Sequence, residues 1–338
     1  MQKYSLFIGI DISKNRIDVC FSQNGKRKQM VHTQFSNNSA GFKKMLSVIK
    51  KYARKHQLST WIACMEHTGV YTLPLCAFFA KQKIDYVLDS ALRIHRSLGL
   101  RRGKSDKADA ADIARYLYLH HKELKPYDLP CENLLKIKHL LALRKRLTKA
   151  KVGSKVAAGE LKRFANPQTV KQVMEYSAQT ATHLKKQLKK IDCDLVQIIK
   201  SDDQLHQLYQ LVTSVKGVGL IVCAYLLVYT NAFTAFQNPR QFACYIGIVP
   251  FPFESGDSIK KPDKVSHLAN KKLKALISNS AQSAILHDKE IKAYFHRKVE
   301  EGKNEFLVKN NVKNKIVKRI FAVVKRRTPY VELYQHQA

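Results

Sequence analysis

The sequence predicts an α/β fold for the N-terminal third of the chain and a mostly helical structure for the rest. Two observations lead to this expectation. Up to residue 88, short apolar runs rich in Ile, Val and Phe alternate with segments whose apolar residues recur at helical spacing. Beyond residue 130, most apolar residues recur at intervals of three and four, as on one face of a helix.

The first expected strand, residues 4–12, carries a carboxylate near its end. Its run F-I-G-I-D-I-S is apolar and is bounded by glycine and serine, as in a buried central strand. A buried aspartate is costly unless a cation or hydrogen bonds compensate it, so Asp11 needs a partner. Asp11 could also cap the following turn, but later segments supply three more carboxylates. We therefore favour a metal site.

Further strands and helices follow in order. Ile17, Val19 and Phe21 alternate with polar residues as in a second strand, and Asn24-Gly25 predicts a hairpin turn into a third strand near 28–33. The next expected elements are a helix (41–53), a strand (61–65), a helix (73–79), a strand (84–88) and a helix (105–121). Three antiparallel strands leading into parallel crossovers form the topology of the ribonuclease-H-like nucleotidyl-transfer fold.

In this topology the first strand, the fourth strand and the last helix converge at one edge. Glu66 ends the fourth strand, and K-S-D-K-A-D places Asp106 and Asp109 on one helix face behind Ser105, the expected N-cap. Clustered carboxylates need cations to stay ionised, so Mg²⁺ or Mn²⁺ is the expected cofactor. Asp112 lies about 120° around the helix from Asp106 and is expected to be solvated or salt-bridged.

The composition favours a polyanionic partner. The 338 residues include 60 Lys and Arg against 26 Asp and Glu, a formal net charge of +34, so nucleic acid is the first candidate. Anionic membrane is the rival partner, but the longest apolar run, 220–229, is too short to cross a bilayer. The N-terminus has no signal-peptide pattern, and we expect a cytoplasmic protein that is nucleoid-associated when bound to DNA.

The seven cysteines form no C-x-x-C pair and no His/Cys cluster with zinc spacing. We expect them to be buried thiols in a reducing cytosol, and we do not expect zinc.

Positive charge is concentrated near the Asp106 pair, over residues 136–163 and over residues 297–327. The second segment carries ten Lys and Arg against one acidic residue, on a helical pattern. These segments are expected to contact phosphate, although each could instead be a solvated basic face. The individual candidates are Arg101, Arg102, Lys104, Arg144, Lys145 and Arg146.

Apolar residues from 184 to 212 follow a 4-3-4-3 spacing with one polar intrusion at Asp202. This pattern is typical of a coiled-coil seam, which serves either self-association or an intramolecular helical hairpin. The break before it falls at Asn166-Pro167.

Two short motifs lie in the C-terminal part, ahead of a further helix expected over 267–286. V-K-G-V-G at 215–219 stands between apolar helical stretches, like the turn of a helix-hairpin-helix element whose amides hold a backbone phosphate. Lys216, Gly217 and Gly219 are therefore nucleic-acid candidates. Ser255-Gly256 lies in a Glu-Ser-Gly-Asp loop, which by itself indicates only a turn.

Taken in order from about residue 5 to 328, these motifs resemble those of the DEDD-type (Piv/MooV-like) transposases of bacterial insertion-sequence family one-ten, which are bridge-RNA-guided recombinases. Two departures touch no candidate catalytic group: His67 follows Glu66, and V-K-G replaces the more usual P-G. The matching pieces are G-I-D-I-S, M-E-H-T-G, K-S-D-K-A-D-A, V-K-G-V-G and G-I-V-P-x-x-x-x-S-G.

The resemblance implies a RuvC-like domain over 1–125, a basic helical and coiled-coil region over 126–208, and a C-terminal transposase domain over 209–338. The partners that it implies are donor and target DNA, a bridge RNA, and further copies of the chain in a dimer or tetramer. Ser255 would attack the DNA phosphate, with Ser258 as the runner-up, and needs activation because a free serine is a weak nucleophile. The implied Mg²⁺ ligands are Asp11, Glu66, Asp106 and Asp109.

We therefore expect a recombinase that inserts and excises its own mobile element. A metal-dependent, junction-resolving endonuclease would share the carboxylates but lack the serine chemistry. A non-catalytic nucleic-acid-binding protein would use the carboxylates structurally. A sugar-kinase or actin-like ATPase would use G-I-D-I-S as its phosphate loop, but the basic charge and the missing second nucleotide-binding half oppose it.

Overall fold

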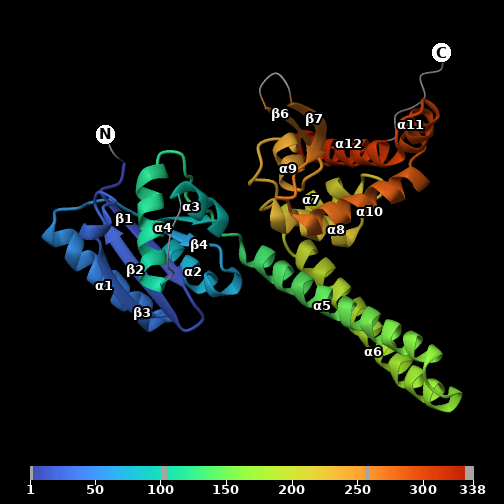
Figure 1. The fold of residues 1–338 in the computed structure, drawn as a ribbon, viewed down its shortest axis with the longest axis horizontal. Coiled ribbons are helices and arrows are strands. Elements are labelled where there is room, and N and C mark those ends of the chain that lie inside the picture. The colour runs from blue at the N-terminus through green and yellow to red at the C-terminus, as the bar shows by residue number, and fades with distance from the viewer. Residues whose placement is uncertain (1–2, 100–104, 256–258, 332–338) are drawn as a thin grey trace. The chain divides into compact units, whose positions relative to one another are not determined.

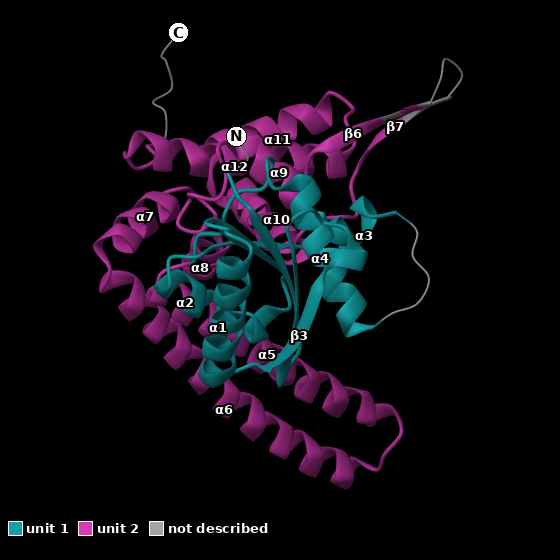
Figure 2. Ribbon diagram, turned by 90° about the vertical axis from the view of Figure 1, so that its left-hand side faces the viewer, with its two compact units in different colours: residues 1–129 teal, residues 130–338 magenta. Residues whose placement is uncertain are grey.

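The structure, a computed structural model, describes residues 3–99, 105–255 and 259–331 (Figure 1). It divides into two compact units, unit 1 over 1–129 and unit 2 over 130–338 (Figure 2). The unit boundary falls close to the end of the expected nuclease domain. The further division of the remainder at residue 208 stays a prediction.

Unit 1 is built on a five-stranded mixed sheet in the order β3-β2-β1-β4-β5 (Figure 1). The first three strands pair antiparallel, β4 pairs parallel with β1, and β5 pairs parallel with β4. The expected mixed α/β order is thereby confirmed, with β1 in the centre. The strands are β1 (Leu6–Ile12), β2 (Arg16–Ser22), β3 (Val31–Ser36), β4 (Trp61–Glu66) and β5 (Asp85–Asp89).

Helices cover both faces of this sheet. One face packs against α1 (Ser39–Lys55) and α2 (Leu73–Lys81) through residues such as Ile8 and Ile10. The other packs against α3 (Ala91–Ser97) and α4 (Asp106–His120) through residues such as Phe7. Side chains alternate along a strand, so the odd-numbered positions of β1 face α4.

The third strand begins at Val31, later than the expected start near residue 28. The turn after β2 is longer than a two-residue hairpin because the hydroxyl of Ser22 accepts hydrogen bonds from the amides of Asn24 and Gly25. A 3-10 turn over Arg27–Gln29 then precedes the strand. The short helix α3 had no counterpart in the expected order.

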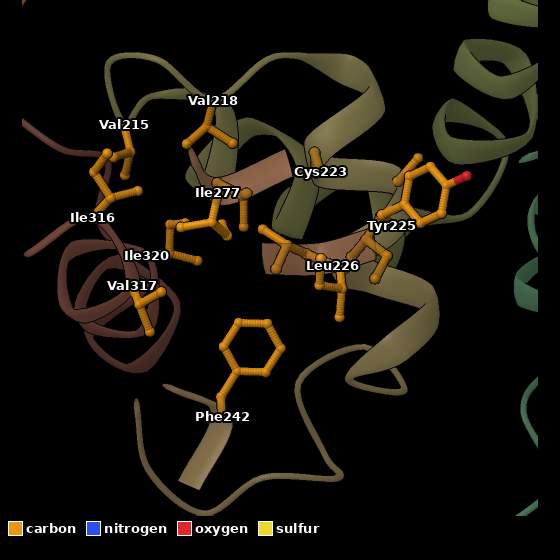
Figure 3. Close-up of a cluster of buried hydrophobic side chains, with 14 of the residues drawn as sticks. Val215, Val218, Cys223, Tyr225, Leu226, Phe242, Ile277, Ile316, Val317 and Ile320 are labelled. Atoms are coloured by element: carbon orange, nitrogen blue, oxygen red, sulfur yellow. The ribbon is translucent and has the colours of Figure 1, made fainter. Parts of the chain in front are cut away.

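In its described residues, unit 2 is helical apart from one β-hairpin. Figure 3 shows its core, where Val215 and Val218 pack near Ile277, Ile316 and Ile320. The elements are α5 (Glu132–Glu160), α6 (Pro167–Lys200), α7 (Asp203–Thr213), α8 (Leu220–Tyr229), α9 (Pro239–Tyr245), β6 (Pro250–Ser255), β7 (Ile259–Val265), α10 (Lys271–His287), α11 (Lys289–Glu300) and α12 (Glu305–Arg326).

We expected the apolar seam over 184–212 to lie on one continuous helix, and this expectation is wrong. Helix α6 ends at Lys200, because the Asp202 carboxylate caps a new helix by accepting a hydrogen bond from the Leu205 amide at 3.1 Å. Before this break, Ile191 and Leu195 are buried in one cluster with residues of α5. Helices α5 and α6 therefore form an intramolecular hairpin (Figure 1), and self-association stays a prediction.

Two smaller expectations need correction. Helix α10 begins at Lys271, not His267, because the Asn270 side chain caps it through the Leu273 amide. Cys131, the N-cap residue of α5, and Cys193 on α6 are exposed, whereas Cys20, Cys64, Cys76 and Cys223 are buried as expected and Cys244 is partly exposed. Among the described residues, the helices are all too short or too polar to cross a membrane.

Candidate active site

Asp11 lies near the end of β1, half-buried on the face that α4 covers. Its pKa is raised to about 6, first by burial and then by the negative charges of Asp109, Glu66, Asp106 and Asp18, in that order. Like charges raise the pKa of a carboxyl group only at short range. The carboxylates that were expected to form the site therefore lie close enough to repel one another.

A close contact between β1 and α4 brings the strand and the helix together. A Cβ on Gly9 would lie 2.1 Å from the backbone nitrogen of Ala114 and 2.3 Å from the carbonyl oxygen of Ala110. No side chain fits between the two elements there, so the helix packs against bare backbone. The first turn of α4 is thereby held near Asp11.

Helix α4 begins where the sequence predicts. The Ser105 hydroxyl accepts a hydrogen bond from the Ala108 amide at 3.3 Å, which makes Ser105 the N-cap. Asp106 and Asp109 stand in the first turn, where the helix dipole favours negative charge. Asp109 is only 8% exposed and lies inside the fold, whereas the Asp106 side chain is 46% exposed.

Glu66 ends β4 beside Asp11. The pairing of Met65 with Ile10 puts the two carboxylates at the same edge of the sheet, and their positions in the two strands give them the same face. The Nε2 atom of His95, from α3, lies 3.5 Å from Glu66 Oε1. Sequence reasoning missed His95, because the contact depends on a helix that was not predicted.

Arg16 contacts the site from the start of β2. Its Nη2 atom lies 2.5 Å from Asp106 Oδ2, and its Nε atom lies 3.9 Å from Asp18 Oδ2. The contact with Asp106 raises the already high pKa of the Arg16 guanidinium. Sequence reasoning missed this residue as well, although it lies only five residues beyond Asp11.

Asp18 is a further carboxylate beside the site. It pairs with Asp11 in the register of β1 and β2, and it is 4% exposed. His32 Nε2 lies 2.8 Å from its Oδ1, and Gln34 donates hydrogen bonds to both of its oxygens. The sequence carried no distinct signal for this residue, since Asp18 is one of the polar residues that alternate with Ile17, Val19 and Phe21.

The donor set suits a hard divalent ion in its chemistry, because carboxylate oxygens are the ligands that Mg²⁺ and Mn²⁺ prefer. In the described part of the chain, no three His, Cys, Asp or Glu side chains stand close enough together to hold one ion. Two contacts help to keep the carboxylates apart: Arg16 pairs with Asp106, and His95 lies against Glu66. For Asp106 to bind a metal ion, its Oδ2 atom would have to turn from the Arg16 guanidinium.

Two other aspartates near the site have structural partners. Asp112 is 2% exposed and pairs with Arg27, so of the two expected alternatives, solvated or salt-bridged, the structure shows the salt bridge. Asp89, at the end of β5, accepts a hydrogen bond from the Tyr116 hydroxyl at 2.7 Å and pairs with Arg93 at 3.2 Å. Neither joins the proposed ligand set.

Ser255 is the last residue of β6, and its backbone pairs with Ile259 across the β6–β7 hairpin. The sequence predicted a loop here, whereas the chain forms a strand up to the serine. Four other candidates, Ser258, Arg101, Arg102 and Lys104, lie outside the described residues.

The basic candidates on α5 divide into two kinds. Arg144 donates hydrogen bonds to both oxygens of Asp192 on α6, at 2.6 and 3.1 Å, and so holds the hairpin together. Lys145 and Arg146 are exposed. Burial, followed by the charges of Lys145 and Arg144, lowers the pKa of Lys272 on α10, so α5 and α10 share a concentration of positive charge.

The V-K-G-V-G segment forms the turn between α7 and α8. Gly217 has a φ of +88°, and a Cβ there would lie 2.4 Å from the carbonyl oxygen of Ser280. Packing against α10 therefore explains why position 217 is a glycine. Gly219 caps α8 and faces open space. Phosphate binding by Lys216 and these glycines stays a prediction.

Comparisons with known proteins match both units. A family model for DEDD transposases of the IS110 type, described as a transposase, matches residues 8–158. A second model, described as the transposase IS116/IS110/IS902 family, matches residues 209–296. The chain belongs to the IS110 family of transposases. It is accordingly an enzyme that recombines DNA.

Relatives of this transposase include the pilin gene-inverting proteins of Moraxella bovis and Moraxella lacunata. Each is 26% identical over 329 residues, which covers 96% of this chain and 97% of the relative. Among solved structures, T. thermophilus RuvC in complex with a Holliday junction substrate aligns with 37% of this chain and all of its own length. The sequence identity is 11% and the TM-score is 0.27.

Proposed function

We propose that this IS110-family transposase cuts and rejoins DNA with a carboxylate-bound divalent metal and a serine nucleophile. The observation that carries the metal part is the meeting of three elements at one edge of the sheet. Glu66 stands beside Asp11 across the pairing of β1 with β4, and Asp106 and Asp109 stand in the first turn of α4, which packs against β1. The raised pKa of Asp11, to which these carboxylates contribute, supports this placement. The proposed metal ligands are Asp11, Glu66, Asp106 and Asp109, and the proposed nucleophile is Ser255.

The chemistry follows from these groups. When bound, Mg²⁺ or Mn²⁺ would stabilise the charge that develops on the phosphoryl oxygens. The Ser255 oxygen would bond to phosphorus as the bond from phosphorus to a sugar oxygen breaks. The serine would give up its proton and the departing sugar oxygen would gain one. Attack by another strand's hydroxyl on the serine phosphodiester would reverse these steps and rejoin DNA without an external energy source.

The metal part is tested with Asp11→Asn and Asp106→Asn. Both variants should lose strand cleavage but keep nucleic-acid binding, because binding depends on Lys and Arg contacts to phosphate. Cleavage should also stop in a chelator and return with Mg²⁺ or Mn²⁺. Normal cutting by the Asp11→Asn protein would refute the metal site.

The serine part is tested by denaturing the protein during reaction with DNA and its guide RNA, and then looking for DNA covalently attached to protein. Ser255→Ala should remove the adduct, and Ser258→Ala, the matched control three residues away, should not. DNA cutting without an adduct would favour the endonuclease alternative. An adduct that survives Ser255→Ala would exclude this serine.

We also propose that a bridge RNA guides the reaction and that the chain acts as a dimer or tetramer. The net charge of +34 supports binding of more than one nucleic acid. The relatives are named for inverting a pilin gene, which supports recombination between two DNA sites and hence more than one active site. RNA that copurifies should map to non-coding DNA beside the coding frame, and light scattering should give a multiple of the 38.7 kDa chain mass.

A further inference from the structure

A hollow of about 340 Å³ opens on unit 1 between β3 and the first turn of α1. Arg16, the residue that contacts Asp106, forms part of its wall. Gln34 and Ser36 of β3 and Lys44 of α1 are also part of the lining. The hollow therefore borders the carboxylate cluster and shares one side chain with it.

The hollow is a feature of the packed fold. Its lining includes Gly41, where a Cβ would lie 2.0 Å from the carbonyl oxygen of Ser36. The missing side chain lets the first turn of α1 close onto the end of β3 (Figure 1). Because a larger residue cannot fit, the distance between the two walls is set by backbone contact.

The lining has the chemistry of an anion site. In the described structure, the side chains around the hollow include the two cations Arg16 and Lys44 and no acidic group. The neutral polar side chains of Ser36 and Asn38 add hydrogen-bond donors, whereas the Gln34 amide nitrogen already donates to Asp18. A guanidinium and an ammonium with neutral donors between them suit a phosphodiester, which carries one negative charge and two free oxygens.

Arg16 cannot serve the hollow and the carboxylate site fully at the same time. Its Nη2 atom is engaged with Asp106 at 2.5 Å, so that carboxylate oxygen is directed to a guanidinium and not to a metal. The Arg16 side chain is 55% exposed, so it has room to turn. A phosphate beside Lys44 would offer the Arg16 guanidinium a further anionic partner besides Asp106 and Asp18.

We propose that this hollow binds a backbone phosphate of the DNA strand, and that Arg16 turns from Asp106 to that phosphate and frees Asp106 for the metal. The inference rests on the proposed metal-dependent function. It adds a DNA subsite, formed by Arg16 and Lys44, and a coupling between DNA binding and metal binding. By linkage, each ligand then raises the affinity for the other by the same factor.

The subsite is tested with a fluorescent oligothymidylate in EDTA, with affinity followed over a range of salt concentrations. Lys44→Gln should lower the slope of log affinity against log salt by about 0.7, the share of one phosphate contact with a single strand. Lys43→Gln is the matched control, because it removes the same charge from the neighbouring residue, which lines a different hollow. Equal slopes in the two variants would overturn the subsite.

An oligouridylate of the same length separates the two nucleic acids. The subsite is assigned to DNA because it adjoins the carboxylates that act on DNA. Lys44→Gln should therefore change the oligothymidylate slope at least as much as the oligouridylate slope. A change confined to RNA would overturn the assignment to DNA.

The coupling is tested by measuring free Mn²⁺ with electron paramagnetic resonance, using an oligonucleotide-only sample as the blank. Oligothymidylate should tighten Mn²⁺ binding to the wild type about tenfold, within the usual range of coupling between sites. Arg16→Gln should bind Mn²⁺ more tightly without DNA and gain less than about twofold from it. Arg16→Lys gives a second variant that retains the charge, and it should also lose most of the gain, because it lacks the forked donor.

A gain that persists in Arg16→Gln would overturn the coupling. Neither measurement uses DNA cleavage, so failure of this inference is distinct from failure of the proposed function. If Asp11→Asn abolishes Mn²⁺ binding while Arg16→Gln leaves the coupling intact, the metal site stands and the role of Arg16 falls.

Discussion

Replacing Asp11 with asparagine should stabilise unit 1 while it abolishes cleavage. At neutral pH the Asp11 carboxylate is held among four other carboxylates on the α4 face of the sheet, and its pKa is raised from 3.8 to about 6. Asparagine has nearly the same shape and no charge. The variant therefore removes the repulsion and keeps the packing of β1 against α4.

The size of the effect follows from the shift in pKa. A shift of this size is equivalent to about 3 kcal/mol when each pH unit counts about 1.4 kcal/mol. Asp11 is partly exposed, so solvent screening reduces this by roughly half, to about 1.5 kcal/mol. Since the folded pKa is raised, the folded state binds protons more tightly than the unfolded state between pH 3.8 and about 6. Wild-type stability thus falls as pH rises through that window, and the advantage of the variant should be full above about pH 6 and vanish near pH 4.

The assay uses the only tryptophan of the chain. Trp61 lies in β4, so its fluorescence during denaturation with guanidinium reports the unfolding of unit 1 alone. Asp18→Asn is the matched control, since Asp18 pairs with Asp11 in the register of the two strands. Its carboxylate accepts hydrogen bonds from neighbouring side chains, so this variant should be destabilised by about 1–2 kcal/mol.

Divalent metal should make the wild type more stable than the Asp11→Asn protein, the reverse of the order expected in chelator. In chelator at pH 7 the Asp11→Asn protein should unfold at higher guanidinium concentration than the wild type. At a Mg²⁺ concentration of 100 times the dissociation constant, the wild type should gain about 2.7 kcal/mol that the variant lacks. An Asp11→Asn protein that is equally or less stable in chelator would refute the argument from carboxylate repulsion.

The other predictions concern unit 2. Replacing Lys145 and Arg146 together with glutamine should lower the salt slope of duplex DNA binding by about 1.8, measured by fluorescence anisotropy, whereas an unchanged slope would make them a solvated face. Arg144→Gln should instead lower the melting temperature seen by circular dichroism, because it breaks the bidentate contact between α5 and α6. Gly217→Ala should cost about 3 kcal/mol of stability from backbone strain and overlap with α10. Gly219→Ala should cost less than about 1 kcal/mol, since the space beside it is open, and similar losses in the two variants would contradict this explanation.

The sequence predicted most of the site because its signals are local. Asp11 ends an apolar run, and Asp106 follows an N-cap serine, so hydrophobic periodicity and capping chemistry were enough to place them. Arg16 and His95 carry no such signal. Their contacts depend on the side-chain direction at one end of β2 and on the short helix α3, and both are settled by tertiary packing.

The helical region shows the same limit. The 4-3-4-3 spacing correctly marked the buried side of α6, where Leu195 is fully buried. Periodicity alone could not show that Asp202 would cap a new helix. An aspartate within a coiled-coil seam and an aspartate at a helix N-cap can stand at the same distance from the neighbouring apolar residues, so the spacing does not distinguish them. Nor could it choose between an inter-chain and an intra-chain partner, because Leu and Ile pack equally well against either.

The contact at Gly9 leaves no room for a larger residue at position 9. A single methyl group there would lie 2.1 Å from the α4 backbone, and ordinary contact begins at 3.4 Å, so the helix would have to retreat by more than 1 Å. The fold could survive such a shift, but a catalytic group displaced by 1 Å can cost about 100-fold in rate. Selection on Gly9 would then act through turnover more than through folding.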